Sequence, residues 1–240
     1  MIVNTPAIVL HTLKYGERKL IVDLFTRQLG RLSFVMTMPK SVHGALKKQY
    51  FQPLTLLEVT FDHRPRVQLQ KLTDARLLVP YTTIPLSPEK LSITLFIAEF
   101  LYYALRSEQR NDPLYDYITD SLQWLDAATQ GVANFHLTFL MRLARFLGFY
   151  PRMEEVRGVF DLREGTFSEV VPTHPDFLQG REAEMVRLLM RMDFGSMHLF
   201  RFSREERQRI LTVLMRYYQL HLPDFPELKS LAVLREVYAN

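Results

Sequence analysis

The chain of 240 residues is long enough for one large domain or two small ones, and its 48% hydrophobic content can supply a buried core. It contains no cysteine, which excludes disulfides and thiolate zinc sites. The first residues do not form a basic segment followed by an apolar signal core, and no apolar run is long enough to span a membrane, so we expect a soluble intracellular protein.

Positive charge is concentrated in the first third of the chain. Residues 1–80 hold 12 of the 30 Lys and Arg and 5 of the 26 Asp and Glu, a net charge of +7. The remaining residues hold 18 basic and 21 acidic side chains, a net charge of −3. A basic N-terminal region favours a polyanionic partner.

The first eighty residues predict five β-strands, because runs rich in Val, Ile, Leu, Phe or Thr are bounded by turn residues. The predicted strands cover 7–14, 18–26, 31–37, 54–61 and 66–78. Five strands fit a small closed barrel. In the second and third strands, alternate apolar residues fall on one face and should fill the barrel. These residues are Leu20, Val22, Leu24, Leu32, Phe34 and Met36.

The connections between these runs also fit a barrel. The turn at 27–30 ends on Gly30, which can adopt a positive φ, and residues 63–65 separate the last two strands. Both connections should be hairpins. The segment 38–52 is longer and less regular, as expected of the loop or short helix after the third strand of an OB fold.

From residue 80 the apolar spacing becomes that of helices, so we predict an α+β protein with two domains. Residues 1–80 should form an OB-fold nucleic-acid-binding domain, and residues 81–240 a helical domain. The expected helices are a central, mostly buried one over 88–108, one opening at Asp112-Pro113, one over 135–147, one opening at the Ser203–Glu206 capping box, and one over 226–237. Two alternating runs indicate an inserted β-hairpin at about 157–171.

The sequence carries no local signature of an enzyme. Its nine glycines are scattered, none is followed by Lys-Ser or Lys-Thr, and neither the zinc-protease helix motif nor the hydrolase nucleophile elbow occurs. His174-Pro175-Asp176 could share a proton as an acid–base pair, although a turn is the better interpretation. We therefore assign no catalytic residue, no metal and no cofactor.

Binding of nucleic acid fits the first domain better, because single strands are held by cations along the phosphates and by aromatic faces for the bases. Each cation could equally be a solvent-exposed surface residue, and Tyr50 and Phe51 are more typical of loop packing than of base stacking. The candidate nucleic-acid contacts are Lys14, Arg18, Lys19, Arg27, Arg31, Lys40, Lys47, Lys48, Arg64, Arg66 and Lys71.

Several short motifs are similar to those of one known family. Near the N-terminus they are AIVLHTLKYGE at 7–17, LFTRQLGR at 24–31, GALKK at 44–48 and FQPL at 51–54. Later motifs are LxRLxxFLGFYP at 140–151, then YxxHL and LKSLxVL between 218 and 234. With this order over nearly its whole length, the chain resembles the RecO family of bacterial recombination mediators.

The resemblance implies an OB fold followed by a helical domain, and a function in recombinational DNA repair. It implies binding of single- and double-stranded DNA, association with RecR, recognition of the C-terminal tail of SSB, loading of RecA onto SSB-coated DNA, and strand annealing. These activities need no nucleotide hydrolysis, so the protein should not be an enzyme. A cytoplasmic, nucleoid-associated location is also implied.

Two departures from the family are visible. Many relatives carry four cysteines as a zinc site after the Gly-Phe-x-Pro motif, where this chain has the cysteine-free segment 159–170, so we predict no zinc. Relatives also tend to place several arginines in the connection 38–52, where this chain has three lysines.

An acidic SSB tail ending in an apolar residue would need a hydrophobic pocket beside cations. The candidates in the helical region are Arg142, Arg145, Arg216 and Lys229, each of which could instead be a surface charge or a helix cap. The alternative function is an OB-fold scaffold that binds proteins or structured RNA without mediator activity, because the fold class alone does not decide function.

Overall fold

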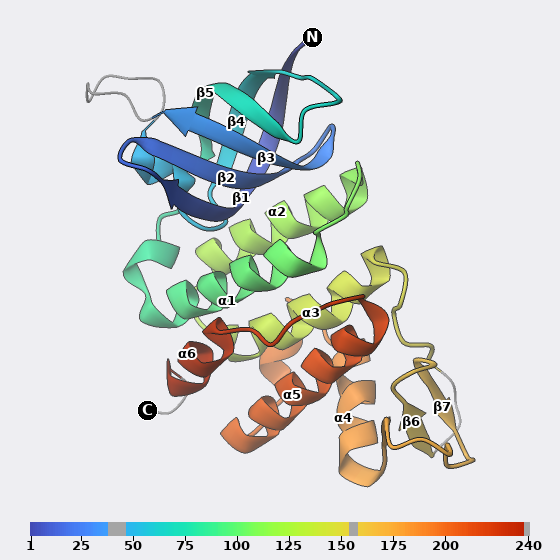
Figure 1. The fold of residues 1–240 in the computed structure, drawn as a ribbon. Coiled ribbons are helices and arrows are strands. Elements are labelled where there is room, and N and C mark those ends of the chain that lie inside the picture. The colour runs from blue at the N-terminus through green and yellow to red at the C-terminus, as the bar shows by residue number, and fades with distance from the viewer. Residues whose placement is uncertain (38–46, 154–157, 238–240) are drawn as a thin grey trace. The chain divides into compact units, whose positions relative to one another are not determined.

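Five N-terminal strands close into a barrel in the computed structural model, which describes residues 1–37, 47–153 and 158–237 (Figure 1). The strand order is β1-β2-β3-β5-β4, and β1 pairs with β4 to complete the ring. All pairs are antiparallel except β3 with β5. This is the OB-fold topology that the sequence predicted. The strands are β1 (Ile2–Tyr15), β2 (Lys19–Thr26), β3 (Gly30–Thr37), β4 (Leu56–Asp62) and β5 (Leu69–Val79).

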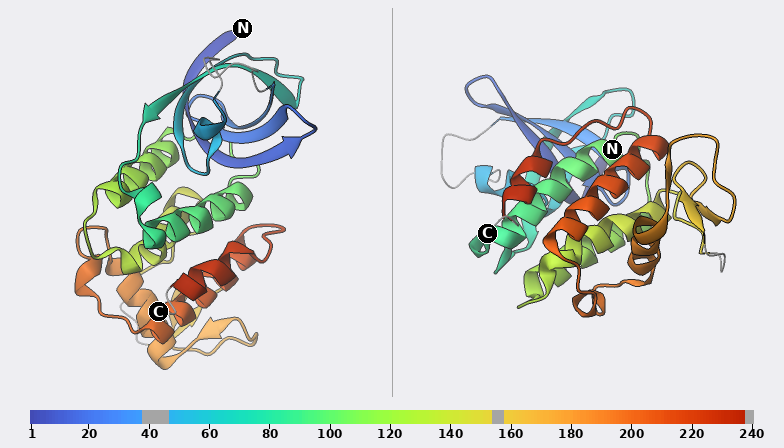
Figure 2. Two further views of the ribbon diagram at one scale, coloured as in Figure 1. Left: turned by 90° about the vertical axis from the view of Figure 1, so that its left-hand side faces the viewer. Right: turned by 90° about the horizontal axis from the view of Figure 1, so that it is seen from below.

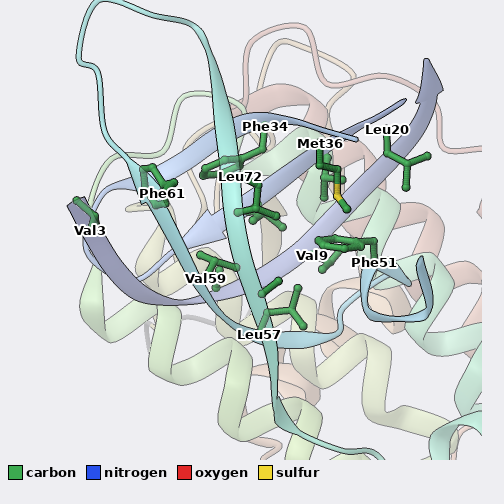
Figure 3. Packing of buried hydrophobic residues seen from close by; sticks show 14 residues of the cluster. Val3, Val9, Leu20, Phe34, Met36, Phe51, Leu57, Val59, Phe61 and Leu72 are labelled. Atoms are coloured by element: carbon green, nitrogen blue, oxygen red, sulfur yellow. The ribbon is translucent and has the colours of Figure 1, made fainter. Parts of the chain in front are cut away.

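The barrel is filled by alternate side chains of its strands, as the period of two requires. Five of the six residues predicted for the interior are buried in one cluster, and Leu32 packs against it partly buried. Phe34 meets Phe61 edge to face, with ring centroids 4.8 Å apart. Phe51, from the short 3-10 helix η1 (Lys48–Phe51), enters the cluster beside Val9 (Figure 3). Phe51 is therefore a packing residue and cannot stack a base.

Two helices pack against the barrel, α1 (Pro88–Ala104) and α2 (Asp112–Ala127) (Figure 1). Together with residues 228–234 they belong to the same compact unit as the barrel. The structure changes from strands to helices near residue 80, where the sequence predicted it. That a domain boundary lies there remains a prediction. The left view of Figure 2 shows the barrel strands closing above these helices.

Helix α1 begins where the sequence indicated. The Ser87 side chain accepts a hydrogen bond from the Lys90 amide, and Pro88 occupies the first helical position. Most of its side chains are buried, as predicted for a central helix, but Leu91 and Leu95 remain 42% and 40% exposed.

The link between the barrel and α1 is fixed to the end of α2 by one carboxylate. Asp126 accepts hydrogen bonds of 2.8 Å from the backbone amides of Thr82, Thr83 and Ile84. The buried Lys90 ammonium donates to the Asp126 main-chain carbonyl at 3.0 Å. These contacts set the direction in which α1 leaves the barrel.

The β2–β3 turn packs closely on the segment that follows α1. Gly30 has a φ of +71°, and a Cβ placed there would lie 2.5 Å from the main-chain oxygen of Glu108. The Arg31 amide donates to that same oxygen at 3.0 Å. Only glycine satisfies both the backbone conformation and the close approach at this turn.

The second compact unit, built mainly from Ala127–Glu227, is helical. Its helices are α3 (Phe135–Phe146), α4 (Gly180–Arg191) and α5 (Arg204–His221). The capping box predicted at Ser203 and Glu206 is present at the start of α5, whereas α4 was not predicted. The last described helix, α6 (Ser230–Val237), was predicted from residue 226 and begins at Ser230.

The inserted hairpin is confirmed as β6 (Val159–Asp161) paired with β7 (Thr166–Ser168). A third short strand that the sequence did not indicate, β8 (Phe177–Leu178), pairs with the other edge of β6. The right view of Figure 2 shows this small sheet beside α4. None of the helices in the described ranges is long and apolar enough to cross a membrane.

Candidate nucleic-acid interface

Exposed cations gather where β1 ends and β2 begins. Lys14 pairs with Leu20, and Lys19 pairs with Thr37 at the end of β3, so these strand ends lie together. Lys71 on β5 is the partner of Val35, two residues before Thr37. We call this surface the basic end of the barrel. Its exposed members are Lys14, Arg18, Lys19, Lys47, Lys48 and Lys71.

Two of the predicted DNA contacts are placed differently, because they join the barrel to the helices. Arg27 donates to Asp116 at 2.9 Å and lies 3.9 Å from Asp112. The Arg31 side chain is only 11% exposed and donates to the main-chain carbonyl of Tyr102. Arg31 is therefore committed to contacts within the fold, whereas Arg27 is paired with aspartates but keeps 42% of its side chain exposed.

The cations of the β4–β5 loop lie at the opposite end of β1, because Ile2 pairs with Asp62 there. Arg64 donates to Asp62 at 3.2 Å, and Asp62 also accepts from the N-terminal ammonium at 2.7 Å. Hydrogen bonds from that ammonium and from Arg64 lower the pKa of the Asp62 carboxyl. Arg66 is exposed beside them, whereas Lys40 lies outside the described residues.

A pocket of about 570 Å³ opens next to the basic end, between the barrel and α1. Thr12 and Leu20 line it from the barrel, and Lys48 lines it from η1. Because Leu20 pairs with Lys14, the pocket lies beside that exposed lysine. We call it the α1 pocket.

Three aromatic rings form one wall of the α1 pocket. The His11 ring lies 4.6 Å from the Tyr102 ring, and the Tyr102 and Tyr103 rings meet edge to face at 4.9 Å. The guanidinium of Arg31 lies 4.5 Å from the Tyr102 ring centroid, in a cation–π contact. These contacts hold Tyr102 in place, and the sequence did not predict either tyrosine as a site residue.

The far side of the α1 pocket contains Glu99 and Lys229. The two carboxylate oxygens of Glu99 accept the backbone amides of Lys229 and Ser230, at 3.1 and 2.7 Å. This places the start of α6 against α1 and turns the exposed Lys229 toward the pocket lining.

The four residues proposed for the SSB tail do not form one cluster. Three lie in the second compact unit and Lys229 lies in the first. Arg142 donates to the Met192 carbonyl at 2.9 Å, and the Arg145 guanidinium lies 4.5 Å from the Tyr150 ring. Arg216 is paired with Asp176 at 2.7 Å.

The small sheet is held by side chains at the place where relatives are expected to bind zinc. Asp176 is buried and accepts hydrogen bonds from Arg163 at 2.8 Å and from Arg216 at 2.7 Å. Hydrogen bonds from Arg216, and then from Arg163, lower the pKa of this carboxyl although its burial acts to raise it. Phe160 and Phe167 pack with ring centroids 4.8 Å apart on the same sheet.

The donors near this sheet do not fit a zinc ion. The chain has no thiolate ligand, and the described residues contain no group of three or more His, Asp or Glu placed to hold a metal. His174 lies 3.3 Å from Asp161, while Asp176 contacts arginines. The acid–base interpretation of His174 with Asp176 is therefore not supported, since each has another partner.

Comparison with known proteins matches this chain over nearly its whole length. The model of the recombination protein O N-terminal region matches residues 1–81, and that of the C-terminal region matches residues 85–232. The DNA repair protein RecO of Phocaeicola vulgatus is 47% identical over the full length of both chains. RecO of Bacteroides fragilis is 46% identical and that of Porphyromonas gingivalis 34%, each over 99% of this chain and the whole relative. The chain belongs to the RecO family of DNA repair proteins.

Proposed function

We propose that the protein is a DNA-binding recombination mediator whose basic barrel end holds single- and double-stranded DNA. The observation that carries this proposal is the group of exposed lysines on adjoining strand ends of an OB fold. Cations on such a surface bind phosphates and release condensed counterions, which provides affinity without sequence preference.

Strand annealing follows from the same electrostatics. Two complementary strands repel each other, and a surface that neutralises the phosphates of both lowers the barrier to pairing. No bond is made or broken, so the protein acts by binding, as expected of a non-enzymatic mediator. The family supports RecR and the SSB tail as protein partners, RecA as an indirect one, and a location with the nucleoid in the cytoplasm.

Of the four SSB-tail candidates, Arg145 is the strongest, because it is exposed and lies outside the α1 pocket. Lys229 is also exposed, but it lines the α1 pocket. Arg142 and Arg216 contribute instead to the packing of the second unit. A charge-reversal series at all four positions, measured against a peptide of the SSB tail, tests this ranking.

The test of the proposed function is annealing of complementary oligonucleotides coated with SSB from the same organism. We expect the wild-type protein to accelerate annealing and the triple variant Lys14→Glu, Lys19→Glu, Lys71→Glu to lose about 10-fold or more in DNA affinity and most of the acceleration. The control carries Arg152→Glu, Arg191→Glu and Arg201→Glu, three exposed cations of the second unit. Equal activity of both variants, or no acceleration by the wild type, would favour the scaffold function.

A further inference from the structure

The α1 pocket has the size of a small-ligand site and the chemistry of a nucleotide site. Its volume of about 570 Å³ lies within the range that small molecules occupy in proteins. It combines an aromatic wall with exposed ammonium groups, which are the two features that bind a base and a phosphate. All of its lining residues belong to the first compact unit.

We propose that the α1 pocket takes one unstacked nucleotide of a bound single strand, with its base against the Tyr102–Tyr103 wall and its phosphate between Lys48 and Lys229. The inference rests on the proposed function, because it gives the basic end of the barrel a defined place for a base.

The aromatic wall is ordered before any ligand arrives. Tyr102 is held by His11 on the barrel and by Arg31, and Tyr103 packs edge-on against it. Rings that are already fixed lose little conformational entropy on stacking a base, so more of the stacking energy appears as affinity. Both tyrosines remain half-buried, which leaves ring surface in the pocket lining.

The charges of the pocket favour an anion. Among the described residues that line it, Glu99 is the one acid, and both of its carboxylate oxygens already accept backbone amides at the start of α6. Lys48 and Lys229 line the pocket from separate segments and are exposed. A phosphate between them would be attracted by two ammonium groups, while the capped Glu99 carboxylate repels it less than an uncapped one would.

The pocket also lies on the path of a strand bound at the basic end. Lys14 follows Thr12 by two residues on β1, so both side chains stand on the same face of the strand. A phosphate backbone held by Lys14 can therefore continue to the pocket mouth. This continuity favours a nucleotide of the bound strand over an acidic peptide as the occupant.

The experiment uses a fluorescein-labelled single strand of about 12 thymidines, and the same strand with one 2-aminopurine, whose fluorescence is quenched by stacking. We expect the full-length wild-type protein to bind the strand and quench the 2-aminopurine. Tyr103→Ala should weaken binding about five-fold or more and abolish the quenching, whereas Tyr103→Phe keeps the ring and should retain both. Lys229→Glu should weaken binding, and Arg191→Glu, the same charge change in the second unit, should not.

Each alternative outcome is distinguishable. If Tyr103→Ala and Lys229→Glu bind and quench like the wild type, the pocket assignment is wrong and the proposed function stands. If the wild type does not bind the strand, the proposed function itself fails. An aspartate-rich peptide whose binding is lost in both variants, while strand binding is kept, would identify a peptide as the occupant and overturn the inference. Circular dichroism of each variant separates lost binding from lost folding, and Lys229→Glu keeps the test valid if Tyr103→Ala does not fold.

Discussion

The guanidinium of Arg31 lies 4.5 Å from the ring centroid of Tyr102 and donates a hydrogen bond to the main-chain carbonyl of that residue. One arginine of the barrel therefore fixes both the ring and the backbone of α1. It also lies 3.8 Å from the buried Asp23 carboxylate, which Ser33 also contacts. A cation that the sequence offered as a DNA contact is a structural element of the first unit.

Substitution of Arg31 should therefore reduce stability more than DNA binding. Arg31→Ala removes the donor to the Tyr102 carbonyl and the cation beside the Asp23 carboxylate, and should lower the free energy of unfolding by about 2 kcal/mol. Lys19→Ala removes an exposed side chain and should change it by less than about 0.5 kcal/mol. Urea denaturation measures both free energies of unfolding. Fluorescence anisotropy with a single strand of DNA should show the opposite ranking, with a larger loss of affinity for Lys19→Ala than for Arg31→Ala. Equal stability of the two variants would contradict this role of Arg31.

The two glycines at barrel turns allow backbone strain to be separated from steric contact. Gly16 and Gly30 have φ values of +72° and +71°, but a Cβ meets nothing within 4 Å at Gly16 and lies 2.5 Å from Glu108 at Gly30. Gly16→Ala should cost about 1 kcal/mol for the left-handed backbone. Gly30→Ala should cost about 3 kcal/mol, because the segment after α1 must also move. Thermal denaturation of the pair tests this, and equal costs would show that the close approach is absent.

Asp126 should make stability depend on pH. Burial acts to raise the pKa of its carboxyl, but the amides of Thr82, Ile84 and Thr83 outweigh burial and hold it at about 2. Because the folded pKa lies below the unfolded value of 3.8, the carboxylate stabilises the fold fully above about pH 5, and this contribution is lost as the pH falls toward 2.

Asp126→Asn should therefore lower the free energy of unfolding by about 2 kcal/mol at pH 7, and the difference from wild type should shrink to about half near pH 3. Asp120→Asn, an exposed carboxylate on the same helix, is the matched control. Urea titrations over the range in which the protein stays folded measure the difference. A gap between Asp126→Asn and wild type that is independent of pH would show that the carboxylate does not anchor the linker.

The barrel could be predicted from the sequence because its signals are local. Alternation in β2 and β3 identifies the inward face, and Gly30 marks the turn between them, independently of distant residues. Helix α4 carried no such signal, since Gln179 provides no side-chain cap and Gly180 opens the helix. Strand β8 has two residues, which is too short for a pattern.

The site could be predicted only as a set of residue types. A sequence shows that Arg31 is positive, but not that a carbonyl 71 positions later will accept its hydrogen bond. The α1 pocket combines residues as distant as His11, Tyr103 and Lys229, and only the folded chain brings them together. Charge counting therefore identified a basic N-terminal region but could not separate surface cations from internal ones.

The small sheet should be stable without a metal. Asp176→Ala removes the acceptor shared by Arg163 and Arg216 and should lower the free energy of unfolding by about 2 kcal/mol. The loss is limited to this size because both arginines are half-exposed and regain hydrogen bonds to water. A chelator such as EDTA should leave the Tm of the wild type unchanged. Glu164→Ala, an exposed acid in the same hairpin, is the control for a general charge effect. A fall in Tm with EDTA that zinc restores would contradict the claim that side-chain contacts hold this sheet without a metal.

The strength of the basic end can be measured as a salt dependence. If three or four phosphates of a single strand are neutralised, the logarithm of affinity should fall with the logarithm of salt concentration at a slope of about −2 to −3. Removing one contacting lysine, by Lys14→Ala, Lys19→Ala or Lys71→Ala, should reduce that slope by about 0.7, because one fewer set of counterions is released. Arg191→Ala, in the second unit, should leave the slope unchanged. Anisotropy titrations at several salt concentrations give these slopes, and a wild-type value near zero would mean that phosphates are not what the barrel binds.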